Sequence, residues 1–109
     1  MISYKVVTLP MAEDDIMDQT DYIAFDLQSS ETALKMVAGF RKAISDLSLF
    51  PQSHELDDDE ELEKYGIRRT YHKNYKIYFI IDEHEKIVYI LRVFHMRADS
   101  KEKLLRLFK

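Results

Sequence analysis

Histidines and late arginines are the residues of this sequence that could support catalysis. The four histidines are His54, His72, His84 and His95. Their positions do not match the ligand spacing of a zinc site, and the absence of Cys excludes thiolate and disulfide chemistry. With only two glycines, no glycine-rich loop can cradle a phosphate. We therefore expect no metal and no other cofactor. A Ser-His-Asp triad stays open, although no nucleophile elbow supports one.

Metal-independent cleavage of RNA is the reaction that these residue types fit. A base activates the 2′-hydroxyl, cations stabilise the charge on the phosphate, and an acid protonates the leaving oxygen. His95 or His72 is the candidate base or acid. The candidate clamp consists of three arginines: Arg69, Arg92 and Arg97. The alternative is that each histidine is structural, the commoner role of an isolated imidazole.

Charge is divided unevenly along the chain. Residues 1–63 carry 4 Lys/Arg and 15 Asp/Glu, a balance of −11, whereas residues 64–109 carry 12 and 5, a balance of +7. The basic part interleaves cations with aromatic rings, as in I-R-R-T-Y-H-K-N-Y-K-I-Y-F. A basic, tyrosine-rich sheet suits a polyanionic partner, whereas an acidic helical part does not.

Composition limits the class of protein. We expect the 109 residues to form one domain, spanning residues 1–109, with a single core. No apolar run is long enough for a membrane-spanning helix, and the amino terminus is too short and too polar for a signal peptide. We therefore expect a cytoplasmic protein without a membrane partner.

Hydrophobic periodicity predicts a helical hairpin after a short strand at residues 2–8. A helix starting at Pro10 has an apolar stripe that includes Ile16, Ile23 and Leu27, with most of its acids outside the stripe. A second helix runs from the break at Ser29 and Ser30 to about Phe50, where Pro51 ends it. Its stripe is Ala33, Val37, Phe40, Ile44 and Leu47.

The sequence pattern after residue 50 predicts an acidic loop, three strands and a short helix. Residues 51–66, which include D-D-D-E-E-L-E, form an acidic loop that is either solvated or a flap over the basic sheet. Strands follow at 67–72, 75–82 and 87–95, and an Asp99–Glu102 capping box opens a last helix. The fold class is α+β, in the order β-α-α-β-β-β-α, with an antiparallel sheet packed on the helical hairpin.

The two-residue turn at Lys73-Asn74 sets the register of the sheet. His72 then pairs with Tyr75, and directly paired residues project to the same side. The apolar face containing Ile77 and Phe79 is buried. We expect Tyr89, Leu91 and Val93 to point inward with it, because Arg92 would be costly to bury unpaired.

The opposite, open face is then cationic and aromatic. It carries Arg69, Tyr71, Lys76, Tyr78 and Arg92, and His95 and Arg97 lie at its rim. Tyrosine stacks on splayed bases and arginine holds phosphates, as in recognition of single-stranded RNA. The predicted RNA-binding residues are Arg68, Tyr71, Lys76 and Tyr78. The alternative is a solvated face, or one that pairs with acids of a protein partner.

Several segments resemble the RelE/ParE family of toxins from bacterial type II toxin–antitoxin modules. They are Y-K-V-V-T-L-P-M-A-E-D-D-I, D-Y-I-A, A-I-S-D-L-S-L-F-P, G-I-R-R, N-Y-K-I-Y-F-I-I-D and V-Y-I-L-R-V-F-H-M-R-A-D, and they cover nearly the whole chain in order. The resemblance implies a toxin that is neutralised by a cognate antitoxin. We expect the binding segment of that antitoxin to be acidic and to fold on binding.

The resemblance leaves the activity divided between two classes. RelE-like members cut mRNA in the ribosomal A site, with cations near the positions of Arg68 or Arg69, Lys76, Arg92, His95 and Arg97. ParE-like members inhibit DNA gyrase without nuclease chemistry. We expect a ribosome-dependent endoribonuclease acting on mRNA at the ribosome. The alternatives are a gyrase inhibitor, which the long hairpin and the lack of any Tyr beyond Tyr89 favour, and an inactive member.

Overall fold

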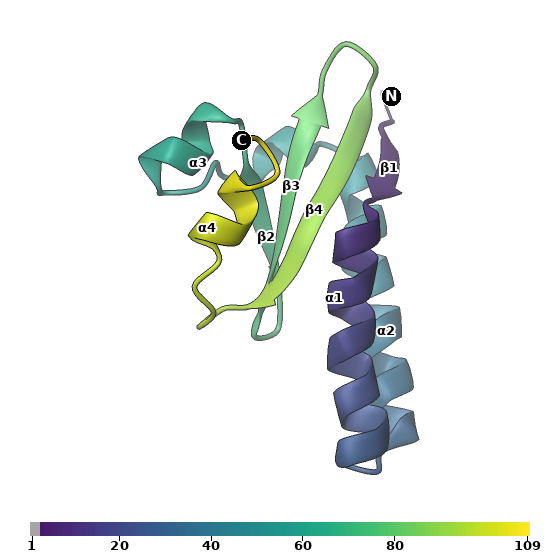
Figure 1. Ribbon diagram of the computed structural model, residues 1–109. Coiled ribbons are helices and arrows are strands. Elements are labelled where there is room, and N and C mark those ends of the chain that lie inside the picture. The colour runs from purple at the N-terminus through teal and green to yellow at the C-terminus, as the bar shows by residue number, and fades with distance from the viewer. Residues whose placement is uncertain (1–2) are drawn as a thin grey trace.

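The computed structural model describes residues 3–109, so the predicted strand at 2–8 is tested only from residue 3. Strands and helices follow the predicted order, with one additional helix (Figure 1). The elements are β1 (Lys5–Thr8), α1 (Pro10–Asp21), a π-helical turn (Tyr22–Asp26), α2 (Ser30–Ser45), 3₁₀ turns at Asp46–Ser48 and Pro51–Ser53, α3 (Glu60–Lys64), β2 (Arg68–His72), β3 (Tyr75–Asp82), β4 (Ile87–His95) and α4 (Lys101–Leu105).

The sheet is mixed rather than wholly antiparallel. Its strand order is β1-β4-β3-β2, and the three later strands are antiparallel, as predicted. β1 joins the edge of β4 in parallel, with Lys5 opposite Ile87 and Thr8 opposite Ile90. The α+β fold class is confirmed; the predicted antiparallel pairing holds for β2, β3 and β4, and β1 adds a parallel strand at the edge.

The helical hairpin packs on one face of the sheet, and its distal half extends beyond the sheet (Figure 1). Ile16 of α1 and Phe40 and Ile44 of α2 are buried against Phe79 and its neighbours. These contacts confirm the predicted stripes of both helices near the sheet. Regular 3.6-residue periodicity places the apolar side chains of each helix on one side, and burial of that side supplies most of the stability of such helices.

The first helix ends in a π-helical turn that moves Leu27 out of the predicted stripe. The N–H of Leu27 donates to the carbonyl of Tyr22, and that of Ser29 donates to Ile23. These longer spacings add residues to the turn, so the apolar stripe rotates. Leu27 is therefore exposed, and the prediction that it faces the core was wrong.

The acidic segment is structured, which corrects the prediction of a loop over 51–66. Leu62 in α3 is buried, and the carboxylate of Asp59 caps that helix by accepting from the backbone N–H groups of Glu61 and Leu62. Leu62 therefore anchors the acidic run to a second hydrophobic cluster, and Lys101 pairs with Asp59 and Glu61 beside it. The stabilised N-terminus explains why so short a helix forms here.

A second hydrophobic cluster covers the sheet face that was predicted to be open. α4 packs there, and the cluster consists of Leu62, Ile67, Tyr78, Leu91, Phe94 and Leu104. The predicted capping box is wrong, because α4 begins at Lys101 with Ser100 at the N-cap and without a side-chain cap. Among residues 3–109, no helix has the length and apolar character needed to cross a membrane.

An irregularity in β4 reverses the predicted facing of two residues. Tyr78 pairs with Arg92 whereas Phe79 pairs with Ile90, so Leu91 is an extra residue in its strand. Val93 packs into the hairpin core as predicted, but Tyr89 and Leu91 pack on the α4 side. This bulge lets Leu91 and Arg92 both lie on the α4 face.

Candidate functional site

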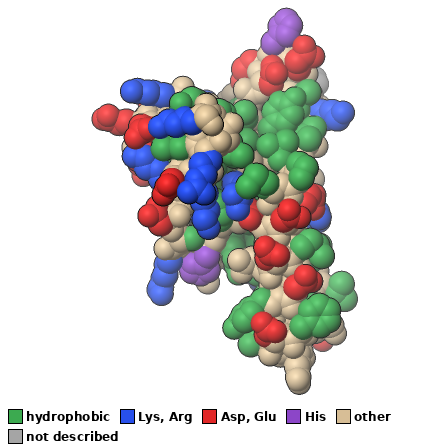
Figure 2. Space-filling model, viewed as in Figure 1, with side chains coloured by type: hydrophobic (Ala, Val, Ile, Leu, Met, Phe, Trp, Pro, Cys, Tyr) green, Lys and Arg blue, Asp and Glu red, His purple; other side chains and the backbone are tan. Residues whose placement is uncertain are grey.

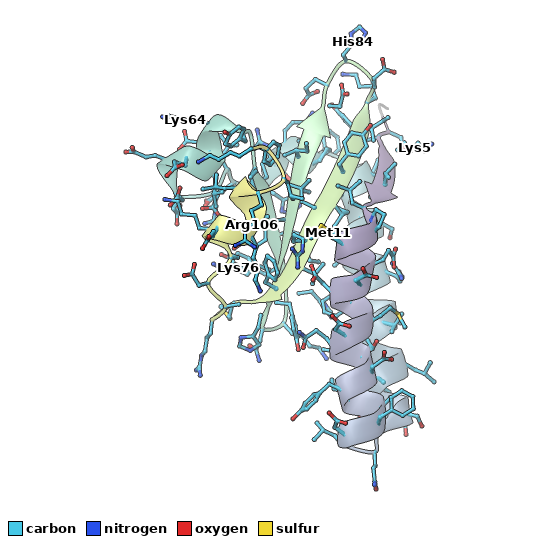
Figure 3. The ribbon with its side chains drawn as sticks, viewed as in Figure 1. Lys5, Met11, Lys64, Lys76, His84 and Arg106 are labelled. Carbon is cyan, nitrogen blue, oxygen red and sulfur yellow. The ribbon has the colours of Figure 1, made fainter. Side chains whose placement is uncertain are left out.

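The candidate site is the cationic face of the sheet, defined as Arg69, Tyr71, Lys76, Arg92 and the adjoining Lys103 of α4. The register confirms the predicted hairpin pairs, Arg69 with Tyr78 and Tyr71 with Lys76. Across the next strand, Tyr78 pairs with Arg92 and Lys76 with Phe94. Lys and Arg side chains gather over α4 and the neighbouring strands (Figure 2), and Lys76 and Arg106 are labelled there (Figure 3).

Phe94 is the aromatic centre of this face. The guanidinium of Arg92 lies 4.5 Å from the centroid of its ring, and the ammonium of Lys103 lies 5.4 Å from it. A ring flanked by two cations holds both through its quadrupole. The arrangement concentrates positive charge beside a nearly buried ring, and α4 contributes part of it. The sequence prediction missed Phe94 and Lys103; their signal was the continuation of the basic, aromatic pattern into the last helix.

Tyr78 is not available to a ligand, which corrects its prediction as an RNA-binding residue on an open face. Its side chain is 2% exposed beneath α4, and its hydroxyl lies 2.9 Å from the hydroxyl of Ser100. The expectation treated one sheet face as solvent, but a sheet with helices on both sides buries both faces. Tyr78 is therefore a core residue with a satisfied hydroxyl.

Arg92 is held by an acid of the amino-terminal part. Its Nε and Nη2 donate to the two carboxylate oxygens of Asp15 at 2.7 and 2.8 Å, and the N–H of Val93 donates to the same carboxylate at 2.9 Å. Both side chains are only 12% exposed. The hydrogen bond to Asp15 raises the pKa of Arg92 above its ordinary value. β1 pairs with β4 only as far as Ile90, so Asp15 occupies the open edge beyond it.

Arg69 is likewise engaged by neighbouring groups. It donates to the hydroxyl of Tyr71 at 3.0 Å and to the carbonyl of Leu56 at 2.8 Å, and it pairs with Asp58 at 3.3 Å. The hydrogen bond to Tyr71, with the nearby carboxylates, raises the pKa of Arg69. Two acids of the amino-terminal part, Asp15 and Asp58, therefore contact the arginines of the basic face.

Arg68 projects to the other side of β2 from Arg69. It pairs with Phe79, a residue of the hairpin core. Its guanidinium donates to the carbonyls of Gln52 at 3.3 Å and His54 at 2.6 Å. Arg68 thereby tethers the segment before α3 to the sheet.

The histidine candidates lie apart from the arginine clamp. His95 pairs with Tyr75, their rings are 5.5 Å apart, and Tyr75 packs against the hairpin core. His95 therefore projects to the hairpin side of the sheet, whereas Arg69 and Arg92 are on the α4 side. Its Nδ1 accepts the N–H of Arg97, which is exposed beyond the strand.

The other histidines belong to separate environments. His72 packs edge-on against Phe40 at 5.3 Å, and it lies directly over Gly39 of α2. His84 is exposed at the tip of the β3–β4 connection (Figure 3). The structure therefore brings together Arg69, Tyr71, Lys76 and Arg92, but it does not bring a histidine to them.

Comparison with known proteins agrees with this fold. A family model described as "ParE toxin of type II toxin-antitoxin system, parDE" matches residues 6–100. A structure of the chromosomal ParDE toxin–antitoxin system from P. aeruginosa is similar with a TM-score of 0.71 and 17% identity, covering 87% of this chain and 98% of that one. A structure of the toxin–antitoxin complex RelBE2 from Mycobacterium tuberculosis is similar with a TM-score of 0.63 and 27% identity, covering 91% and 97%. The curated protein sequences give no match.

The family match spans nearly the whole described chain, and the mixed sheet between a helical hairpin and a short last helix has the fold of both solved toxins. The chain therefore belongs to the ParE toxin family of type II toxin–antitoxin systems.

Proposed function

We propose that this toxin acts by binding a protein target rather than by cutting RNA, and that the target is DNA gyrase, as the resemblance to ParE-like toxins implies. The observation that supports this proposal most is the separation of His95 from Arg69 and Arg92 by the thickness of the sheet. A general base and a phosphate clamp must reach the same nucleotide within hydrogen-bond distance. A binding toxin has no such requirement.

The ion pairs of the two arginines support the same proposal. A guanidinium that clamps a phosphate needs free donors, and both Arg92 and Arg69 already donate to carboxylates. Asp15 is held in a nearly buried pair, so replacing it by a phosphate would expose an unpaired carboxylate. Arg69 and Arg92 therefore stabilise the fold through contacts within the chain, and their donors are not free for a phosphate.

Inhibition of supercoiling tests the proposal. Purified toxin added to gyrase and relaxed plasmid is expected to reduce supercoiling as its concentration rises, and His95→Ala is expected to inhibit equally. His84→Ala, a change at an exposed turn, is the matched control. Full supercoiling at every toxin concentration would overturn the proposal.

A ribosome-dependent endoribonuclease is the second candidate, and the cations around Phe94 favour it. Lys76, Arg92 and Lys103 place positive charge on one face, next to an aromatic ring, as RNA-binding surfaces do. If the toxin is such a nuclease, Lys103→Ala is expected to lower the rate of mRNA cleavage in a translation extract. Lys86→Ala, in the β3–β4 connection, is the control and should leave that rate unchanged. Absence of growth arrest on expression would indicate an inactive member instead.

We propose that a cognate antitoxin neutralises the toxin in the cytoplasm by laying an acidic segment on the cationic face. Both similar structures are of toxin–antitoxin systems, and the exposed cations here complement carboxylates. Co-purification with the product of an adjacent small gene tests this: Lys76→Glu with Lys103→Glu should weaken the complex at least about tenfold, because two attractions become repulsions. Unchanged affinity would contradict it.

A further inference from the structure

The distal half of the helical hairpin contains an apolar groove that no element of the described chain covers. It lies between α1 with its π-helical turn and α2, has a volume of about 280 Å³, and is lined mainly by Met17, Ala24, Phe25, Ala33, Leu34 and Val37. This part of the hairpin projects past the sheet (Figure 1), so the groove is distant from the cationic face. It is therefore a separate surface of the molecule.

The side chains at its rim are unusually exposed for their type. Phe25 is 74% exposed and Leu34 is 71% exposed. Single exposed apolar residues are common, but an apolar groove between two helices with such residues at its rim is typical of protein interaction sites. The π-helical turn supplies one side of this rim through Phe25, and α2 supplies the other through Leu34. Such turns are frequent at functional positions in helices.

Charge around the groove is strongly negative. Residues 10–37 contain seven Asp or Glu and one Lys, and that lysine, Lys35, pairs with Glu31 at 3.3 Å. Asp14, Asp18, Asp21 and Asp26 are exposed along α1 and its π-helical turn. Acidic and apolar side chains alternate over this helix (Figure 2). A partner here must supply apolar side chains together with cations.

We propose that this groove binds a basic amphipathic helix of a partner protein. A helix presents apolar anchors at i, i+3, i+4 and i+7 to a groove between two helices. Its flanking Lys and Arg would meet Asp21, which lines the groove, and the other exposed aspartates of α1 and its π-helical turn. The acidic segment expected of an antitoxin is disfavoured here, because its carboxylates would face those aspartates. The inference does not depend on whether the toxin cuts RNA or inhibits gyrase.

Binding of synthetic helices tests the proposal. The probe is an amphipathic peptide with leucines at helical spacing, lysines on both flanks and a single tryptophan; the toxin has no Trp, so the peptide alone reports binding by its fluorescence. The matched probe has glutamates in place of the lysines. We expect the lysine peptide to bind and the glutamate peptide to bind at least about tenfold more weakly, with a difference that shrinks at high salt.

Variants of the toxin locate the binding. The double variant Phe25→Ser, Leu34→Ser should lower the affinity for the lysine peptide at least about tenfold, because both residues are apolar anchors of the rim. Both side chains are exposed, so the variant is expected to keep the fold. Leu49→Ser, an exposed apolar residue outside the groove, is the control. Equal binding of both peptides, or unchanged binding by the double variant, would overturn the proposal. So would sedimentation of the free toxin as a dimer that the double variant dissociates, since a second copy would then occupy the groove.

Discussion

Removing the carboxylate of Asp15 is expected to destabilise the protein far more than removing an exposed acid of the same helix. In Asp15→Ala, Arg92 loses both of its carboxylate contacts and the N–H of Val93 loses its acceptor, within a pair whose side chains are 12% exposed. Breaking a buried pair costs about 3–5 kcal/mol and breaking an exposed one about 0–1 kcal/mol. The partial burial here places the expected loss near 3 kcal/mol, toward the buried limit.

Thermal unfolding measures this loss. For a chain of this length the unfolding entropy converts about 3 kcal/mol into a decrease of about 13 °C in Tm. Glu13→Ala is the matched control, because Glu13 lies on the same helix as Asp15 and also accepts two hydrogen bonds from an arginine, Arg41 of α2. The side chain of Glu13 is 39% exposed. The control should lose at most about 4 °C.

A conservative variant separates charge from hydrogen bonding. Asp15→Asn keeps an acceptor for one donor but removes the charge, so its Tm is expected to fall between those of the wild type and Asp15→Ala. If Asp15→Ala and Glu13→Ala lowered Tm equally, the reasoning that Asp15 closes the open edge of β4 would be refuted.

Three further outcomes are expected. Gly39→Ala should lower stability by about 1–3 kcal/mol, because a Cβ there would lie 2.3 Å from Nε2 of His72, and the same change should cost much less in a His72→Ala background; an equal cost in both backgrounds, measured by urea unfolding, would contradict this contact. The hydrogen bonds from Tyr4 and Gln52 lower the pKa of Glu83, so its contribution to stability is complete above the ordinary pKa of 4.5 and is lost as pH falls through the lower folded-state value. Glu83→Gln should therefore reduce the loss of stability on acidification in urea titrations, whereas Glu85→Gln should leave it unchanged. Tyr78→Phe should cost about 1 kcal/mol, because the hydroxyl of Ser100 loses its buried partner, and an unchanged midpoint would count against that bond.

Local patterns predicted much of the fold because short-range geometry determines those parts. The turn at Lys73-Asn74 fixes the pairing of His72 with Tyr75, and with it the pairing of Arg69 with Tyr78. Lys73 adopts the left-handed backbone conformation of such a turn, with φ of 53°. The helical stripes near the sheet were predictable for the same reason: 3.6-residue periodicity is local.

The candidate site was predicted less well because it depends on contacts between distant segments. Asp15 and Arg92 are 77 residues apart in sequence, and no local pattern pairs them. The burial of Tyr78 depends on where α4 packs, and the facing of Leu91 depends on a single extra residue in β4. Periodicity alone could not reveal this bulge, which turns Tyr89 and Leu91 to the α4 side. Val93 faces the hairpin core as predicted, and alternation from it places His95 on the same side, opposite Arg69 and Arg92.

Primer-extension mapping of ribosome-bound mRNA tests the central claim most directly. Purified toxin is added to a translating extract at concentrations that stop supercoiling by gyrase, and the mRNA is mapped at codon resolution. Because His95 lies on the hairpin side of the sheet and Arg69 and Arg92 lie on the α4 side, the account predicts intact transcripts at every concentration. Cleavage at A-site codons that His95→Ala or Arg92→Ala abolishes would contradict it.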